Sequence, residues 1–565
     1  MTHSNGGHLL VDVLEHAGVD TVFGVVSVHN LPLVEAVSQR LRFVPVRHEA
    51  TAVNAADGYA RARDGLGCAL TSTGTGAGNA AGSLVESLSS ATSVLHVTGQ
   101  VELAHLGSGR GFIHETRDQL GMLTAVSKSA HTITDTRTAR LILWQAVLDA
   151  RQAPFGPVSV EWPIDLQYFP YPETGLGEYP DPAPERVSQV PGEVVTLLAQ
   201  AERPLVWAGG GVARAGESLR QLVERLGAGL LTSNSGRGAV GEDHPLCVGN
   251  YATTPAGQQL LHDADLLLSL GTHFRSNETA DYRLQVPATH IQVDIDEAAI
   301  GRVYPAKVGV VSDIDAFLRT VLAQLPDGSA TDPNWSAQVT KVRGEVRDRQ
   351  RRNLGEHARF ADALREVLPR NAVVARDVTI ASSSWGNRLL EFFDPRDNVF
   401  PRGGGIGQGL GMGIGAAVAR PDTPTVVVAG DGGLAVHLGE LLTLAQERPW
   451  LVLLLFNDRG YGVLRNMQDA QGSPRAGVDL ATPDFELLSR SLALPYLRIG
   501  APAEVTGALR GAVAAGGPVV VEVDLAAYGE MPAPFTPPVH VPTPEEVKRR
   551  LSWPTPRSSS VWSYS

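Results

Sequence analysis

The sequence lacks the features that mark secreted and membrane-spanning proteins. It has only two cysteines, Cys68 and Cys247, so it offers neither a disulfide framework nor a cysteine spacing typical of metal sites. Its first residues contain no basic region followed by a long apolar segment, so we expect no signal peptide. The apolar runs are strand-length, which excludes a membrane-spanning helix. Together these absences favour the reducing cytoplasm.

The sequence also lacks a long basic segment. The net charge is −13 and no basic run stands out, which argues against a nucleic-acid-binding surface. Apolar residues make up 43% of the chain, enough for complete hydrophobic cores. We therefore expect small-molecule partners, with no nucleic acid and no membrane.

Three successive blocks alternate apolar strands with helical segments. This order predicts an α/β protein with three doubly wound domains, each built on a central, mostly parallel sheet. The domains are predicted at residues 1–170, 188–345 and 355–530. The proline-rich tail, residues 531–565, is predicted to lie over a site as a lid.

The strongest single motif lies in the third block. Residues 425–429 and 451–456 are predicted to be buried strands because they are continuously apolar. Asp431 and Asn457 follow these strands closely, 26 residues apart, at the carboxyl edge where open α/β sheets bind ligands. Two oxygen ligands suit Mg²⁺, which shares its coordination sphere with phosphates.

Glycines surround the aspartate. Gly430, Gly432 and Gly433 allow the backbone to approach a diphosphate closely. The Gly-Asp-Gly segment is predicted to form a turn, followed by a helix over about residues 437–447. The motif therefore predicts a diphosphate and magnesium site.

A second motif lies near the amino terminus. Glu49 directly follows a strand and precedes a helix predicted from Ala50 to Arg63, whose face of small residues permits close packing. Taken alone, such a glutamate is more often a helix N-terminal carboxylate that interacts with the helix dipole than a catalytic group.

The two motifs together, in this order and spacing, resemble those of thiamine diphosphate (ThDP) enzymes. The branch resembled is that of acetolactate synthase, benzoylformate decarboxylase and benzaldehyde lyase. The resemblance covers nearly the whole chain. Its further supporting segments are Val22–Pro32, Thr71–Gly82, His290–Asp296, Gly403–Ala419 and Gly517–Leu525. It implies an N-terminal pyrimidine-binding domain, a central domain and a C-terminal diphosphate-binding domain.

The resemblance also implies roles for individual residues. Glu49 would hydrogen-bond the aminopyrimidine ring, so that the imino nitrogen of the cofactor removes the thiazolium C2 proton. Asp431 and Asn457 would ligate Mg²⁺ through their side chains, with the backbone carbonyl of Arg459 as a third ligand. Leu410 would force the bent cofactor conformation; Met412 is the alternative. The other cofactor contacts implied are Gly76, Thr379, Gly430, Gly432, Gly433, Gly460, Tyr461 and Gly462.

Two histidines are predicted to be catalytic. His29 falls where benzaldehyde lyase has an active-site histidine, and His114 lies where acetolactate synthase carries a glutamine. An imidazole titrates near neutral pH, which suits proton transfer. A structural role for either histidine is an equal alternative. Val28, the residue before His29, lies where benzoylformate decarboxylase has a serine that contacts the substrate. This difference disfavours substrate recognition of the benzoylformate type.

The function implied is that of a ThDP- and Mg²⁺-dependent lyase or transferase. It would act on a 2-oxo acid or 2-hydroxy ketone, by decarboxylation or carboligation through an enamine. The alternatives are an acetolactate synthase-like carboligase, a benzaldehyde lyase-like enzyme and a non-catalytic ThDP-fold scaffold subunit. Glu49 and Asp431 would meet across the interface of a homodimer or homotetramer. The glycines of Gly209–Gly211 resemble a nucleotide-binding turn, but we expect no FAD there.

Overall fold

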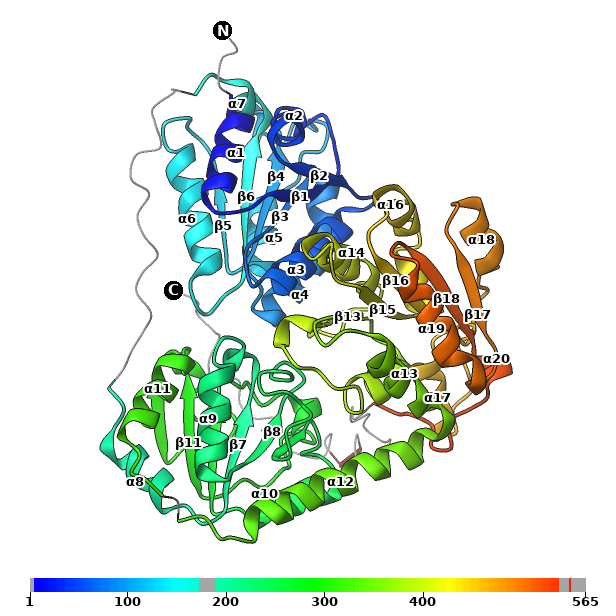
Figure 1. The fold of residues 1–565 in the computed structure, drawn as a ribbon. Coiled ribbons are helices and arrows are strands. Elements are labelled where there is room, and N and C mark those ends of the chain that lie inside the picture. The colour runs from blue at the N-terminus through cyan, green and yellow to red at the C-terminus, as the bar shows by residue number, and fades with distance from the viewer. Residues whose placement is uncertain (1–4, 172–188, 329, 538–547, 550–565) are drawn as a thin grey trace.

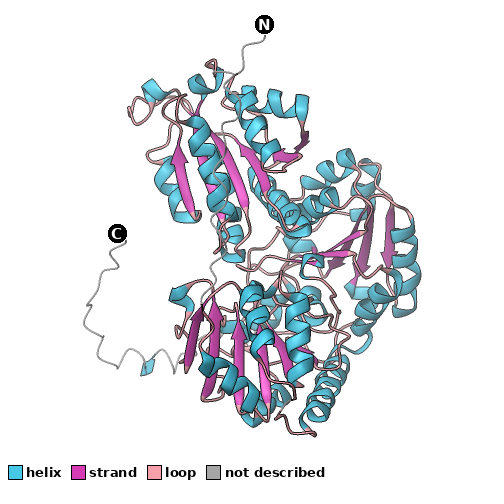
Figure 2. Ribbon diagram, turned by 60° about the vertical axis from the view of Figure 1, so that its left-hand side comes forward, coloured by secondary structure: helices cyan, strands magenta, loops and turns pink. Residues whose placement is uncertain are grey.

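The computed structural model describes residues 5–171, 189–328, 330–537 and 548–549 (Figure 1). Three sheets are present, each of six strands with every strand pair parallel, and helices cover their faces (Figure 2). This arrangement confirms the predicted fold class. The lid prediction falls largely outside the described residues, since residues 538–547 and 550–565 are not among them.

The N-terminal sheet has the strand order β2-β1-β3-β4-β6-β5. Its strands are β1 (Thr21–Gly24), β2 (Arg42–Pro45), β3 (Gly67–Thr71), β4 (Val94–Gln100), β5 (Ser129–Thr132) and β6 (Pro157–Pro163). Its helices are α1 (Gly6–His16), α2 (Leu31–Arg40), α3 (Glu49–Arg63), α4 (Thr75–Ser90), α5 (Gln119–Val126), α6 (Ala139–Arg151) and α7 (Ile164–Tyr168).

The central sheet has the order β12-β11-β10-β7-β8-β9, in which the chain starts in the middle and winds outward in both directions. Its strands are β7 (Pro204–Ala208), β8 (Gly229–Thr232), β9 (Cys247–Gly249), β10 (Leu266–Leu270), β11 (Thr289–Asp294) and β12 (Val308–Val311). Its helices are α8 (Gly192–Gln200), α9 (Gly216–Leu226), α10 (Pro255–Asp263) and α11 (Ile314–Gln324). The long α12 (Trp335–Leu354) then runs beneath both the central and C-terminal domains (Figure 1).

The C-terminal sheet has the order β14-β13-β15-β16-β18-β17, which repeats the order of the N-terminal sheet. Its strands are β13 (Val373–Arg376), β14 (Asn398–Val399), β15 (Thr425–Gly430), β16 (Leu451–Asn457), β17 (Tyr496–Ile499) and β18 (Val519–Asp524). Its helices are α13 (Arg359–Val367), α14 (Gly409–Ala419), α15 (Asp431–Val436), α16 (Glu440–Glu447), α17 (Gly462–Ala470), α18 (Phe485–Ser491), α19 (Val505–Ala514) and α20 (Leu525–Tyr528).

One local prediction differs from the structure. The segment after β15 forms two short helices, α15 and α16, rather than a Gly-Asp-Gly turn and one helix from about residue 437. Asp431 is the first residue of α15, where a carboxylate interacts favourably with the helix dipole. The segment between the two helices includes His437, whose Nδ1 lies 2.9 Å from the carbonyl oxygen of Gly407.

Helices α3 and α14 pack backbone against backbone and join the N-terminal domain to the C-terminal domain. A Cβ atom at Gly58 of α3 would lie 2.0 Å from the carbonyl oxygen of Met412 in α14. In the reverse direction, a Cβ atom at Gly415 would lie 1.9 Å from the carbonyl oxygen of Ala55. Real side chains cannot occupy such positions, so the glycines set the distance between the helices.

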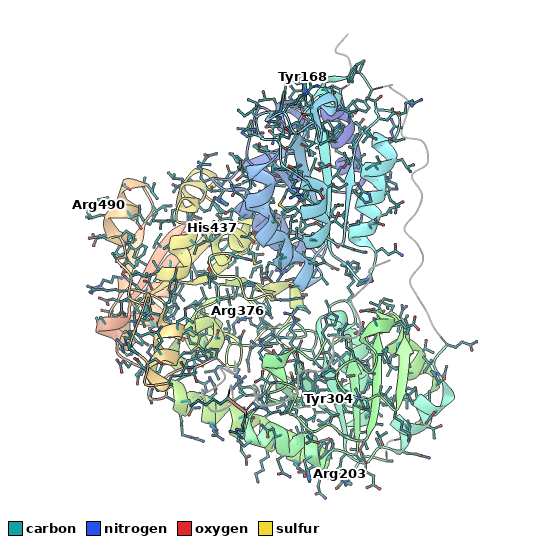
Figure 3. The ribbon with its side chains drawn as sticks, turned by 180° about the vertical axis from the view of Figure 1, so that it is seen from behind. Tyr168, Arg203, Tyr304, Arg376, His437 and Arg490 are labelled. Carbon is teal, nitrogen blue, oxygen red and sulfur yellow. The ribbon has the colours of Figure 1, made fainter. Side chains whose placement is uncertain are left out.

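Polar contacts between the N-terminal and C-terminal domains occur just before α3. The backbone N–H of Arg47 donates to both carboxylate oxygens of Glu440, at 3.0 and 3.3 Å. His48 caps α3 by accepting from the Ala50 N–H. Its ring also contacts the ring of His437, with centroids 5.2 Å apart. Figure 3 shows His437 where the N-terminal and C-terminal domains meet. The start of α3 is therefore held from both sides.

The two cysteines do not form a disulfide. Cys68 and Cys247 are buried free thiols, and burial raises the pKa of both to about 12. Among the described residues, no helix combines the length and apolar character needed to span a bilayer.

We predict that Gly415→Ala lowers the stability of the protein by about 1–3 kcal/mol, since the added methyl group would overlap the Ala55 carbonyl. Urea unfolding followed by far-UV circular dichroism would measure the change. The matched control is Gly344→Ala in α12, where a Cβ atom meets nothing within 4 Å. The control should unfold at the same or a higher urea concentration, because alanine favours helix. Equal effects of the two substitutions would contradict this account of the helix contact.

Candidate functional site

A cavity of about 1070 Å³ opens at the carboxyl edge of the C-terminal sheet. Segments that follow β13, β15 and β16 line it, together with α17. The predicted site residues that line it are Thr379, Gly430, Gly432, Gly433, Asn457, Arg459, Gly460, Tyr461 and Gly462. The structure therefore brings most of the residues predicted for the diphosphate end together around one space.

Gly430, Gly432 and Gly433 form a cradle in the cavity wall, where they let neighbouring segments pack closely. A Cβ atom at Gly432 would lie 2.8 Å from both the Gly460 carbonyl oxygen and the Tyr461 ring. At Gly430 it would lie 3.2 Å from Oγ1 of Thr379. Backbone N–H groups can approach a phosphate closely where no Cβ intervenes. This cradle fits the diphosphate of the expected cofactor.

Asp431 is buried at the floor of this edge. One carboxylate oxygen accepts from the Asp458 N–H at 3.2 Å, and the other accepts from the Gly460 N–H at 2.8 Å. Burial raises the pKa of Asp431. Burial and the nearby Asp431 raise the pKa of Asp458 to about 7. Two carboxylates this close favour a bound cation, which would stabilise both charged forms.

Asn457 is oriented by neighbouring strands. Its amide nitrogen donates to Glu522 of β18 at 2.7 Å, and the second oxygen of Glu522 accepts from the Tyr496 hydroxyl at 2.7 Å. The Asn457 side-chain oxygen therefore turns toward the loop that follows, where it accepts from the Arg459 N–H at 3.1 Å. Glu522 was not predicted as a site residue; its signal is a carboxylate inside an otherwise apolar strand.

The oxygen-rich donor set fits Mg²⁺, except at the third predicted ligand. The Arg459 carbonyl already accepts from the Leu480 N–H at 3.0 Å and from the Arg465 guanidinium at 3.3 Å. Its role as a ligand stays a prediction that this geometry does not favour. No group of three or more His, Cys, Asp and Glu with metal-binding geometry occurs in the part of the chain described. The predicted set does not need one, because amide and carbonyl oxygens complete it.

Leu410 and Met412, the two predictions for the bulky residue beneath the cofactor, do not line this cavity. Both are buried in the core beside α3, with 2% and 0% of their surface exposed. Ile406, which was not predicted, lines the cavity and is 40% exposed. The repeated alternation of glycine and apolar residues along this segment concealed which residue faces the cavity.

A buried aspartate holds the loop that carries Ile406. The Asp377 carboxylate accepts from the N–H groups of Gly407 at 3.0 Å and Gly409 at 3.3 Å. Burial raises the pKa of Asp377 to about 6. Asp377 thereby fixes the loop between the cavity and α14.

Glu49 lies at the carboxyl edge of the N-terminal sheet, not in the C-terminal cavity of its own chain. It is half-buried, and Asn79 donates to its Oε2 at 3.1 Å. The predicted cofactor contact Gly76 lies beside it: a Cβ atom there would be 2.9 Å from Oε1 of Glu49. The two halves of the predicted site are therefore separate within one chain.

The structure brings the two predicted catalytic histidines together although they are 85 positions apart. Nδ1 of His114 lies 3.3 Å from Nδ1 of His29, and the ring centroids are 5.1 Å apart. Burial and then the neighbouring His114 lower the pKa of His29. His114 has a left-handed backbone, with φ of +67°, a strained conformation that is frequent at functional sites.

A buried polar network supports the backbone beside these histidines. Gln119 donates to Glu161 at 3.0 Å and accepts from the Gly74 N–H at 2.7 Å. A Cβ atom at Gly74 would lie 2.5 Å from the His114 carbonyl oxygen. Gln119 and Glu161 were not predicted from the sequence, because neither spacing nor composition shows that they meet.

The glycines of Gly209–Gly211 have a packing role. A Cβ atom at Gly209 would lie 2.1 Å from the carbonyl oxygen of Gly271, and Gly211 also packs against Gly271. Close contact between the segments after β7 and β10 accounts for these glycines without a bound nucleotide.

Three family models match the chain, one for each domain. They describe the N-terminal TPP binding domain of thiamine pyrophosphate enzymes over residues 4–122, the central domain over 192–321 and the C-terminal TPP binding domain over 380–523. Thiamine pyrophosphate and thiamine diphosphate are the same molecule. The chain belongs to the thiamine pyrophosphate enzyme family, as the resemblance in the sequence predicted.

Curated relatives match most of the chain. It is 32% identical to a probable 2-ketoarginine decarboxylase of Pseudomonas aeruginosa, over 86% of this chain and 88% of the relative. It is 28% identical to a probable acetolactate synthase large subunit of Methanococcus aeolicus, over 90% of each. It is 27% identical to the acetolactate synthase isozyme 2 large subunit of Escherichia coli, over 92% of this chain and 95% of the relative. Together they support an enzyme that depends on thiamine diphosphate.

We predict that His114→Asn raises the pKa of His29, because the substitution removes the charge that repels a proton there, while burial keeps the value below that of a free imidazole. Protein labelled with ¹³C at histidine Cε1 would report the titration by NMR. His96 serves as the internal control, since complete burial lowers its pKa to about 3 and its signal should not move between pH 5 and 8. An unchanged His29 pKa in the variant would show that the two rings do not interact electrostatically.

Proposed function

We propose that the chain binds ThDP and Mg²⁺ at the C-terminal cavity and decarboxylates a 2-oxo acid. The observation that carries this proposal is the placement of Asp431 and Asn457 at the ends of adjacent strands, beside a glycine cradle. The relative named as a probable 2-ketoarginine decarboxylase supports this reaction class. When bound, ThDP supplies an electron sink for cleavage of the carbon–carbon bond next to a carbonyl.

In this proposal each protein group has a limited task. Asp431 and Asn457 would hold Mg²⁺, and Thr379 would donate to a phosphate oxygen. Glu49 would exchange a proton with the aminopyrimidine nitrogen and so control the acidity of the cofactor carbon. Ile406 takes the supporting role predicted for Leu410 or Met412, since it alone of the three lines the cavity.

A second copy of the chain would complete the site. Glu49 does not reach the C-terminal cavity of its own chain, so we assign it to the cavity of a partner in a homodimer or homotetramer. Exposed apolar side chains on helices of both domains support such an interface. They are Val85 and Leu88 of α4, Val436 of α15 and Leu442 of α16. A cytoplasmic location fits the buried free thiols.

The histidine pair would handle the proton of the product. With their Nδ1 atoms 3.3 Å apart, one ring donates to the other, so the buried His29 would orient the half-buried His114, which would give up a proton and regain it from solvent. Protonation after loss of CO₂ releases an aldehyde. Carboligation is the second candidate, favoured by the acetolactate synthase relatives that match over 90% or more of this chain.

A product screen tests the function. The protein, supplied with ThDP and Mg²⁺, would be incubated with pyruvate, benzoylformate, branched 2-oxo acids and 2-ketoarginine, each with and without an added aldehyde. We expect CO₂ and an aldehyde from at least one acid. Ligated 2-hydroxy ketones as the main product would favour carboligation, and tight ThDP binding without turnover would favour the scaffold alternative.

We predict that Glu49→Gln slows hydrogen–deuterium exchange at C2 of bound ThDP by about 100-fold or more, because the amide cannot exchange a proton with the pyrimidine. Quench-flow NMR of the cofactor measures this exchange, and circular dichroism verifies the fold. The control Asn79→Ala removes only the neighbouring donor to Glu49 and should have a smaller effect. Normal exchange in Glu49→Gln would refute the proposed role.

We predict that Glu522→Ala weakens Mg²⁺ binding about 10- to 100-fold, because Asn457 loses the partner that orients its amide. Titration of the ThDP-bound protein with Mg²⁺ would measure the affinity. Tyr496→Phe leaves the Asn457 contact intact and should change the affinity less. Unaltered Mg²⁺ affinity in Glu522→Ala would separate Glu522 from the metal site.

A further inference from the structure

A groove leads away from the C-terminal cavity, between the central and C-terminal domains. The cavity adjoins a second one of about 500 Å³, and both are lined by Val378, Ser384 and Pro534. The second adjoins a third of about 530 Å³, and both are lined by Gln350 and Arg388. Neighbouring spaces therefore share walls, and the third is large enough for a small ligand of its own.

The far end of the groove carries excess positive charge. Arg283, Arg349 and Arg388 line it, against a single carboxylate, Asp281. Asp281 lies 3.5 Å from the Arg283 guanidinium and neutralises that arginine. Arg349 and Arg388 form no ion pair with any carboxylate among residues 5–171, 189–328, 330–537 and 548–549. The exposed Arg349 and the half-buried Arg388 therefore line this space without a carboxylate partner.

Arg388 is held in place although its charge is not neutralised. Its guanidinium donates to Oγ1 of Thr253 at 3.2 Å and lies 5.7 Å from the centre of the Tyr251 ring. The Tyr251 hydroxyl in turn donates to the Arg388 carbonyl oxygen at 3.0 Å. Burial lowers the pKa of Arg388, as expected for a cation removed from water without an acidic partner. A bound anion would offset this cost.

A helix N-terminus points to the same space. Helix α10 begins at Pro255, with Thr254 as its N-cap, and Thr253, Thr254 and Pro255 all line the far end of the groove. Pro255 has no N–H, and the Gly257 N–H already donates to Oγ1 of Thr254 at 3.2 Å, so the helix contributes only its dipole. That dipole adds to the positive potential of the arginines.

We propose that the far end of this groove binds an oxyanion of a small molecule, carried by a phosphate or carboxylate group. The planar guanidinium of Arg349 or Arg388 can form two parallel hydrogen bonds to either group. The site is distinct from the diphosphate cradle, which lies in the first cavity and uses glycines rather than arginines. This inference does not depend on the reaction assigned to the protein.

The test is a calorimetric titration of the full chain with inorganic pyrophosphate and, separately, with glutarate. Saturating ThDP and Mg²⁺ block the first cavity during both titrations. We expect one additional binding event per chain, weakened by added salt because it depends on charge. Tighter binding of pyrophosphate would identify phosphate as the group recognised, and tighter binding of glutarate would identify carboxylate.

Arginine variants show where the anion binds. Arg349→Ala should weaken binding about tenfold or more, and Arg349→Lys should weaken it less, because a lysine keeps the charge without the fork. The control is Arg352→Ala, an exposed arginine on the same helix that lines none of the three cavities. Arg388→Met keeps a long side chain against Tyr251 and should also weaken binding; its melting temperature verifies folding.

Two outcomes would overturn the inference: no binding of either anion, or the same affinity in Arg349→Ala as in Arg352→Ala. Failure of ThDP to bind would instead refute the proposed function. It would leave the arginine-dependent anion binding measurable in the same titration, so the two failures are distinguishable.

Discussion

The backbone contact between α3 and α14 is the constraint on which the arrangement of the site depends. Glycines at the crossing let carbonyl groups approach where side chains would otherwise stand, so neither helix can shift by a side-chain width without overlap. Both helices begin at functional segments. Glu49 opens α3, and the loop with Ile406 leads into α14. One close contact therefore sets the positions of the Glu49 carboxylate and of Ile406 in the cavity wall.

Around this frame, polar side chains are fixed by neighbours rather than by their own rotamer preferences. Asp377 holds the Gly407 loop, Glu522 turns the Asn457 amide, and Gln119 fixes Gly74 beside the histidines. Each of these three supporting side chains is itself buried, where a polar group without a hydrogen-bond partner would lower the stability of the protein. Such fixed surroundings suit a site whose cofactor performs the bond cleavage and whose protein supplies position and charge.

Sequence patterns predicted the architecture well because parallel strands buried on both faces are continuously apolar, as residues 451–456 are. The same logic placed Asp431 and Asn457 at the sheet edge. It could not show which side chain of a segment faces the cavity or which distant residues meet. The alternation of glycine and apolar residues did not show that Ile406 lines the cavity while Leu410 and Met412 lie in the core, and Glu522 contacts Asn457 only because β18 pairs with β16. The pairing of His29 with His114 likewise requires the fold.

The hydrogen bonds from the Arg47 amide to Glu440 have a consequence for how the chain acquires its active form. The residue two positions before Glu49 is tied to a helix almost 400 positions later in the sequence. The N-terminal domain has one core cluster of its own, but residues such as Phe23 and Ala52 belong to a second cluster that it shares with the C-terminal domain. The first turn of α3, which begins with Glu49, therefore acquires both this apolar packing and its contact with Glu440 only after the C-terminal domain has been synthesised.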